Sequence, residues 1–152
     1  MADKYIVSKY EKLTDEQINR EIGARLGFWV YHYDKDVASK CYYTLMTSEG
    51  DPVTHDLVWG LKGRGEHKTA NEAWGDVPNF AGDALVGLTL LGRDHNDMPY
   101  ATEWTASCTK EGWQFSFEDG PVVRSTEYAR GNAIAWLEWR DQVAAATPTI
   151  NA

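Results

Sequence analysis

The chain has 152 residues, a formal net charge of -8 at pH 7 and a hydrophobic content of 43%, which suits one domain with a substantial core. Seven Trp, eight Tyr and four Phe supply large side chains for that core, each of which removes about 150–250 Å² from water when buried. The negative charge excludes a general binder of polymeric nucleic acid, because neutralising phosphates requires a basic surface.

The sequence contains neither a membrane segment nor a disulfide framework. No segment approaches the roughly 20 apolar residues of a membrane helix, and the N-terminal MADKYIVSKYEK lacks the apolar core of a signal peptide. We therefore expect no membrane partner and a protein that stays in the compartment where it is made. Cys41 and Cys108 belong to no CxxC pair, and we expect both as buried free thiols.

The first predicted element is a helix from about Asp15 to Leu26. Thr14 and Gln17 have the spacing of a capping box, in which each side chain accepts a hydrogen bond from the other residue's backbone N–H. Gly27 supplies the left-handed stop. Apolar residues recur on one face at four-residue spacing: Ile18, Ile22 and Leu26.

Residues 28–61 change to the pattern of strands. FWVYHY, KCYYTLMT and DLVWGL are rich in aromatic and β-branched residues, and turn-forming stretches separate them, so we expect a meander. Residues 61–78 follow neither period and contain three glycines. We predict that they form an exposed loop.

The helical period returns at Asn79, after Pro78, and we expect the helix to end at Gly92. Its predicted apolar face consists of Phe80, Ala84, Leu85, Leu88 and Leu91.

Two strands, YATEWTASC and WQFSF, then form a hairpin whose loop contains Gly112. VVR adds a third short strand, and Ser125 or Thr126 caps a last helix that runs to about Ala145. Its broad apolar stripe includes Ile134, Trp136, Leu137 and Trp139.

These elements predict an α+β fold, an α/β sandwich in which a mainly antiparallel sheet packs with about three helices. We expect residues 1–146 to form a single domain. Within it, residues 28–77 are a strand-rich insert with an exposed basic loop. Residues 147–152 are expected to be a frayed tail.

No recognised catalytic motif is present. GxSxG, Walker, GxGxxG and HExxH patterns are absent, and His32, His55 and His67 are dispersed. Residues 92–97 place carboxylates and an amide beside His95, but a metal site needs ligands that converge from several directions, so we favour a solvated loop there. We expect no enzymatic activity, no metal site and no cofactor.

A short basic stretch is the exception in this acidic chain. Residues 62–68 contain Lys62, Arg64 and Lys68, together with His67 and two glycines. The glycines allow backbone N–H groups to approach an anion closely, and an arginine can hold a phosphate through two hydrogen bonds. The alternative is a solvated loop whose cations balance nearby acids.

Tryptophans lie on both sides of this stretch. Trp59 precedes it and Trp74 follows it, so a nucleobase could stack on either ring, an interaction of about 1–3 kcal/mol per base. Core packing is the favoured interpretation of each indole taken singly, and it is their position on both flanks of one loop that favours a ligand site. The predicted ligand-binding residues are Lys62, Arg64, Lys68, His67, Trp59 and Trp74.

Three blocks of the sequence resemble the phage ABA sandwich domain family, small α/β proteins of bacteriophages and prophages. They are LTDEQINREIGARLGF, PNFAGDALVGLTLL, and WTASCTKEGWQFSFEDG followed by STEYARGNAIAWLEW, and together they cover roughly half of the chain. The blocks are patterns of core and cap positions, so the resemblance implies fold and viral origin, and no catalytic residues. Residues 28–77 are longer and richer in strand than the family pattern.

By analogy with other small phage proteins, the resemblance suggests a non-enzymatic counter-defence protein in the host cytoplasm that sequesters an immune nucleotide signal. Its partner would be a small anionic nucleotide, bound by a homo-oligomer that builds pockets at its subunit interfaces. The alternative is a protein-interaction module that inhibits a host or phage protein through a sheet edge or aromatic patch. A hydrolase of nucleotide signals is a third possibility.

Overall fold

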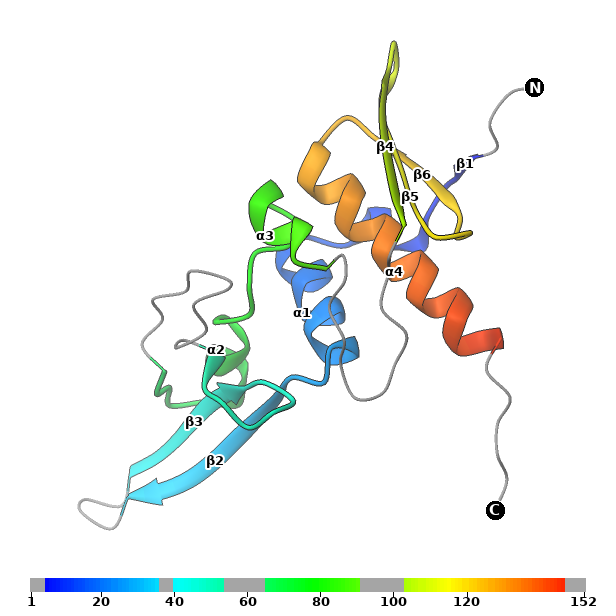
Figure 1. Cartoon of the computed structure of the whole chain (residues 1–152). Coiled ribbons are helices and arrows are strands. Elements are labelled where there is room, and N and C mark those ends of the chain that lie inside the picture. Colours follow the sequence, from blue (N-terminus) through cyan, green and yellow to red (C-terminus); the bar gives the residue numbers. More distant parts are fainter. Residues whose placement is uncertain (1–4, 36–39, 54–64, 91–102, 147–152) are drawn as a thin grey trace.

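The computed structural model describes residues 5–35, 40–53, 65–90 and 103–146 (Figure 1). The predicted α+β class is confirmed: a four-stranded mixed sheet, a separate two-stranded hairpin and the helices make up the described chain. The elements in chain order are β1 (Tyr5–Ile6), the 3-10 helix η1 (Lys9–Lys12), α1 (Asp15–Arg25), β2 (Trp29–Lys35), β3 (Lys40–Met46), α2 (Ala70–Trp74), α3 (Ala84–Leu88), β4 (Trp104–Thr109), β5 (Gly112–Phe117), β6 (Val122–Ser125) and α4 (Tyr128–Ala146).

The larger sheet has the strand order β1-β6-β5-β4. β4 and β5 form the predicted antiparallel hairpin and β6 is the predicted third strand, whereas β1 joins the sheet in parallel beside β6. β1 was not predicted, because two residues are too few to show a strand period. The β4–β5 turn is tight, with Thr109 opposite Gly112, which has a φ of 125°.

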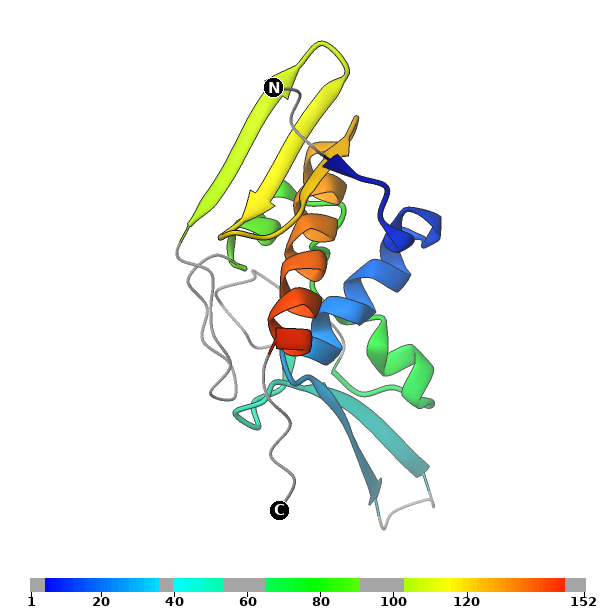
Figure 2. The same cartoon turned by 90° about the vertical axis from the view of Figure 1, so that its right-hand side faces the viewer.

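α4 is the central element of the core. It lies between the sheet and α1, which cover two of its sides (Figure 2). Phe115 and Phe117 project from β5 onto this helix, where their rings pack against Tyr128 and Trp139. The predicted apolar stripe is confirmed, because Ile134, Trp136, Leu137 and Trp139 are all buried.

α1 begins and ends as predicted. Thr14 Oγ1 accepts from the Gln17 N–H at 3.2 Å, and Gln17 Oε1 accepts from the Thr14 N–H at 2.9 Å. Gly27 follows the helix with a φ of 88°, the left-handed conformation that the sequence predicted there. This ending turns the chain from α1 into β2.

A charged cluster joins α1 to the C-terminal half of α4. Asp141 accepts hydrogen bonds from Arg25 Nε at 3.0 Å and from the Tyr10 hydroxyl, and Arg25 also donates to Tyr10 at 2.8 Å and to Glu21 at 2.7 Å. Burial alone would raise the pKa of Asp141, but hydrogen bonds from Tyr10 and Arg25 and the charges of Arg25 and Lys9 lower it below its usual value. The cluster therefore stabilises the ionised form of Asp141.

Two predicted segments differ from the structure. Residues 61–78 are not wholly a loop, because α2 forms within them, with Thr69 as its N-cap and Ala73 buried. The helix predicted from Asn79 is confined to Ala84–Leu88. The Ala81 N–H donates a hydrogen bond to Asn19 Oδ1 at 2.8 Å. This contact keeps the chain before Ala84 in a non-helical conformation.

The predicted apolar face of this helix is also wrong in part: Phe80 is buried, whereas Ala84, Leu85 and Leu88 are exposed. Gly87 is instead the buried contact, and its carbonyl accepts from the Asn132 side chain of α4 at 3.4 Å. The prediction that Cys108 is buried is wrong as well: the thiol is exposed on β4, beside the β4–β5 turn. The DLVWGL strand, the Leu91 and Gly92 helix end and the tail lie outside the described residues.

The Asp141 cluster predicts a pH dependence of stability. The contribution of a carboxylate with a lowered pKa is present above the pKa of the unfolded chain, about 3.9, and is lost as pH falls through the lower pKa of the folded state. Asp141→Asn should lower the free energy of unfolding by about 1–3 kcal/mol at pH 7, and urea titrations should show that this deficit shrinks below pH 4. Asp119→Asn, in the exposed turn before β6, controls for net charge; a deficit independent of pH would contradict the prediction.

Gly131 tests the contact between α4 and the sheet. A Cβ at this position would lie 2.7 Å from Ser125 Cβ and 2.8 Å from the Phe115 ring. Helix propensity alone predicts that Gly131→Ala stabilises the protein by about 1 kcal/mol, whereas overpacking predicts a loss of about 1–3 kcal/mol. We expect a loss of stability, measured as a lower midpoint of urea unfolding. A higher midpoint would contradict this expectation, because it would show that the contact between sheet and helix accommodates the added methyl group.

Candidate functional site

A row of aromatic side chains lies on one face of the β2–β3 hairpin. This aromatic row consists of Trp29, Tyr31 and Tyr33 of β2 and Tyr42 of β3. Trp29 and Tyr31 are 41% and 47% exposed, although large aromatic side chains normally contribute to a core. The row therefore presents a substantial apolar surface that the fold itself does not bury.

The period of the strands explains why these rings are exposed. Successive side chains of a strand point to opposite faces, so Val30 packs against the core while Trp29 and Tyr31 face away from it. Leu45, opposite Val30 on β3, is fully buried. α2 packs on the hairpin and completes its support.

The rings contact one another along the row. Trp29 meets Tyr31 edge to face with 6.0 Å between centroids, Tyr31 and Tyr33 are 5.5 Å apart, and Tyr33 stacks on Tyr42 across the strands at 5.8 Å. The Trp29 Nε1–H donates to the Thr47 carbonyl at 2.9 Å. These contacts fix the rings before any partner arrives, which reduces the entropy that binding would cost.

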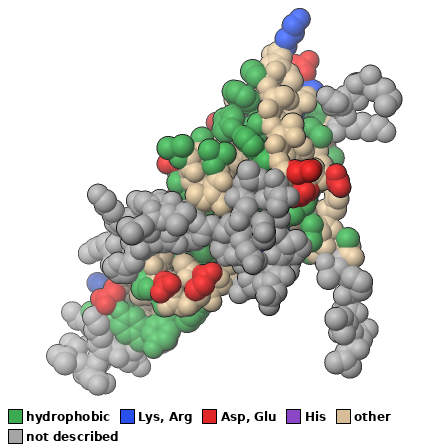
Figure 3. All heavy atoms as spheres, in the orientation of Figure 1, with side chains coloured by type: hydrophobic (Ala, Val, Ile, Leu, Met, Phe, Trp, Pro, Cys, Tyr) green, Lys and Arg blue, Asp and Glu red, His purple; other side chains and the backbone are tan. Residues whose placement is uncertain are grey.

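The described end of the predicted basic loop is held beside this row. His67 pairs with Tyr43 of β3 through backbone hydrogen bonds of 2.8 and 2.9 Å, and the Tyr33 hydroxyl donates to Glu66 Oε1 at 2.6 Å. The His67 Nε2 lies 2.7 Å from Asp76 Oδ2, and both side chains are only 13% exposed. Figure 3 shows hydrophobic side chains gathered over the hairpin at the lower left, with acidic side chains beside them.

The six predicted ligand-binding residues have different outcomes. Lys62, Arg64 and Trp59 lie outside the described residues. Lys68 is exposed, and His67 pairs with Asp76. Of the three cations only Lys68 is among the described residues, so their convergence on a ligand stays a prediction.

Trp74 serves the core. It is partly buried and packs against the central hydrophobic cluster. A Cβ on Gly23 of α1 would lie 3.3 Å from its ring, so the indole and the helix are in close contact. The surroundings of Trp74 therefore agree with the alternative interpretation, core packing.

The aromatic row was not predicted as a site, although the sequence carries a signal for it. Aromatic residues occupy alternate positions in FWVYHY, at 29, 31 and 33. That alternation predicts a common face, but it does not say whether the core or solvent meets that face. The position of α2 and the core behind Val30 decides the question.

The described residues contain no group of three or more His, Cys, Asp and Glu side chains that could hold a metal ion. His55 and His95, with the predicted loop at 92–97, lie outside them. None of the helices in the described ranges is long and apolar enough to cross a bilayer.

Comparisons of the chain with protein-family models, with curated proteins and with solved structures find no match. The similarity to the phage ABA sandwich domain family therefore stays a prediction from the sequence blocks.

Proposed function

We propose that this protein is a binding module whose aromatic row docks onto a partner protein. The observation that carries the proposal is the exposure of Trp29 and Tyr31 on a pre-ordered hairpin face. Tyr and Trp are the residues most often found at the energetic centres of protein interfaces, because they bury a large area and lose few rotamers. The acidic chain, with a net charge of -8, disfavours a polyanionic partner.

The arrangement of the rings also favours a protein over a nucleobase. A base stacks on the free face of a ring, but Tyr33 already lies between Tyr31 and Tyr42, at 5.5 and 5.8 Å. Neighbouring rings therefore flank Tyr33 on both sides, which leaves little room for a base to stack on it. The hairpin also projects from the body of the fold (Figure 1), whereas small molecules usually occupy concave sites.

This proposal can be tested by capturing a partner on the full chain from a bacterial lysate and then measuring its affinity for purified variants. Removing a residue at the centre of an interface costs about 2 kcal/mol or more, so Tyr31→Ala should weaken binding by about thirtyfold or more. Leu85→Ala is the matched control, because Leu85 is 78% exposed on α3, away from the hairpin. Equal binding by both variants would contradict the proposal.

A nucleotide ligand is the second candidate function. The observation in its favour is that Glu66 and His67 lie against β3 and Tyr33, which brings the end of the basic stretch beside the aromatic row. Lys62, Arg64 and Lys68 would then hold the phosphates. Sequestration of an immune nucleotide, and the counter-defence role that goes with it, derives from the family resemblance.

Native mass spectrometry of protein purified from bacteria with active nucleotide-signalling defences separates the two candidates. A nucleotide binder would retain a small molecule that is released intact on denaturation, and its affinity would fall as salt increases. Arg64→Ala should then weaken binding by more than Lys12→Ala, a change at an exposed lysine of η1. Retention of a stoichiometric protein without a small mass would favour the aromatic-row proposal.

A further inference from the structure

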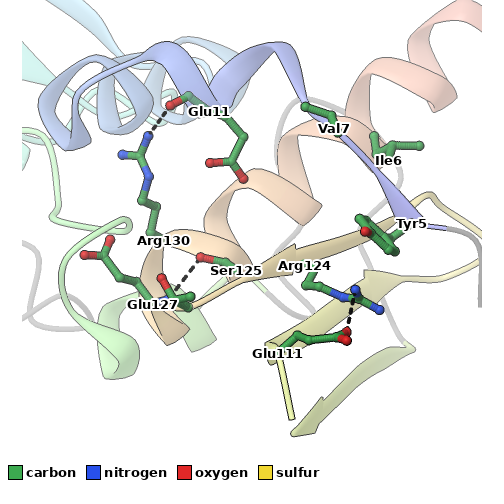
Figure 4. Close-up of a pocket in the computed structure, with 10 residues that line it drawn as sticks. Tyr5, Ile6, Val7, Glu11, Glu111, Arg124, Ser125, Glu127 and Arg130 are labelled. Atoms are coloured by element: carbon green, nitrogen blue, oxygen red, sulfur yellow. Dashed lines mark hydrogen bonds and ion pairs between the residues drawn. The ribbon is translucent and has the colours of Figure 1, made fainter. Parts of the chain in front are cut away.

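A second surface lies in the larger sheet, where β1 covers only part of β6. β1 pairs with Val122 and Val123 and then ends at Ile6, so its pairing does not reach Arg124 and Ser125. The uncovered part of β6 lies beside a groove of about 650 Å³. Its walls are the β1–η1 segment and the start of α4, as Figure 4 shows.

The groove combines apolar side chains with a strand edge. Tyr5, Ile6 and Val7 line one wall and are 46%, 37% and 88% exposed. Exposed apolar strand edges are usually blunted with charges, since they invite pairing with another chain. At the opposite edge of the same sheet, β4 exposes the polar residues Thr105 and Ser107.

The cations of the groove are engaged within the protein. Arg124 pairs with Glu111 at 2.8 Å, and its guanidinium lies 3.8 Å over the Tyr5 ring. Arg130 pairs with Asp15 at 2.7 Å and donates to the carbonyls of Glu11 and Leu13 at 2.9 and 2.6 Å. Neither arginine is available as an open site for an anion.

Two carboxylates of the groove are not neutralised in this way. The side chains of Glu11 and Glu127 line it and have no ion-pair or hydrogen-bond partner in the part of the chain that the structure describes. The uncompensated charge of the groove is therefore negative. A second copy of the chain would bring the same carboxylates together, so the charge disfavours self-association here.

We propose that this groove binds an extended, positively charged protein segment that adds to the sheet alongside β6. Main-chain hydrogen bonds to the β6 edge would supply affinity, as in other cases of strand addition. Apolar side chains of the segment would cover Ile6 and Val7, and Lys or Arg side chains would pair with Glu11 and Glu127. This surface is separate from the aromatic row, and its function does not depend on the proposal made there.

The proposal is tested with the full chain and the synthetic peptide KVKVKV, followed by NMR amide shifts and calorimetry at low salt. Binding should shift residues 5–11 and 122–130 and weaken as salt increases. The double variant Glu11→Gln, Glu127→Gln should bind about tenfold or more weakly, since it removes both uncompensated charges. Glu72→Gln, an equal change at an exposed position of α2, should bind as the unmodified protein does.

Two further ligands separate strand addition from simple charge attraction. KVKVKV that is N-methylated at every internal peptide bond keeps the charges but lacks backbone amide N–H donors, and spermidine has charge without a peptide backbone; both should bind at least about tenfold more weakly than KVKVKV. EVEVEV should not bind. The proposal would be overturned if any of these three ligands bound as tightly as KVKVKV. It would also be overturned if the shifts were confined to other residues, or if KVKVKV did not bind at about 1 mM. A dimer in sedimentation that Val7→Asp dissociates would overturn it as well, because the occupant would then be a second copy.

Discussion

The need to cover α4 on two sides constrains the whole fold. Every residue from Gly131 to Leu137 is buried, so this helix has no solvent-facing side over nearly two turns. The sheet covers one side and α1 another, and Gly131 allows the sheet to approach closely enough for Phe115 to pack beside it. Near the other end, Asp141 joins α4 to α1 through Arg25 and Tyr10.

This central packing decides which surfaces are left without an internal partner. The sheet turns Phe115 and Phe117 toward α4, and α1 contributes Ile18 and Ile22 to the same core. The chain leaves α1 at Gly27 and enters a hairpin that touches the core along one face only. Its other face carries the aromatic row, in which Trp29 and Tyr31 are exposed.

The aromatic row and the groove beside β6 differ in chemistry and position. The aromatic row lies at the hairpin end of the molecule and the acidic groove at the β1 end, well apart in both views (Figures 1 and 2). The first offers ordered rings and hydroxyls, and the second offers an uncovered strand edge with carboxylates. The two proposed docking surfaces therefore do not overlap.

Local patterns determined much of the fold. The Thr14–Gln17 capping box, the Gly27 stop, the β4–β5 hairpin and the long apolar stripe of α4 depend on residues a few positions apart, so the sequence alone predicted them. The α+β class followed from their order. Interactions between distant segments decided the length of the second helix and the packing of α2. Asn19 accepts a hydrogen bond from the Ala81 N–H, which shortens the predicted helix, and Gly23 lies against the Trp74 ring.

The candidate sites depend on the same distinction. Sequence could identify Trp29, Tyr31 and Tyr33 as residues of one strand face, but only the position of the core behind Val30 left that face exposed. The sequence also shows the charges of Glu11 and Arg124, which are 113 positions apart, but it does not show that both line one groove. Spacing along the chain fixes local hydrogen bonds and periodicity, whereas exposure and charge compensation depend on which distant residues the folded chain brings into contact.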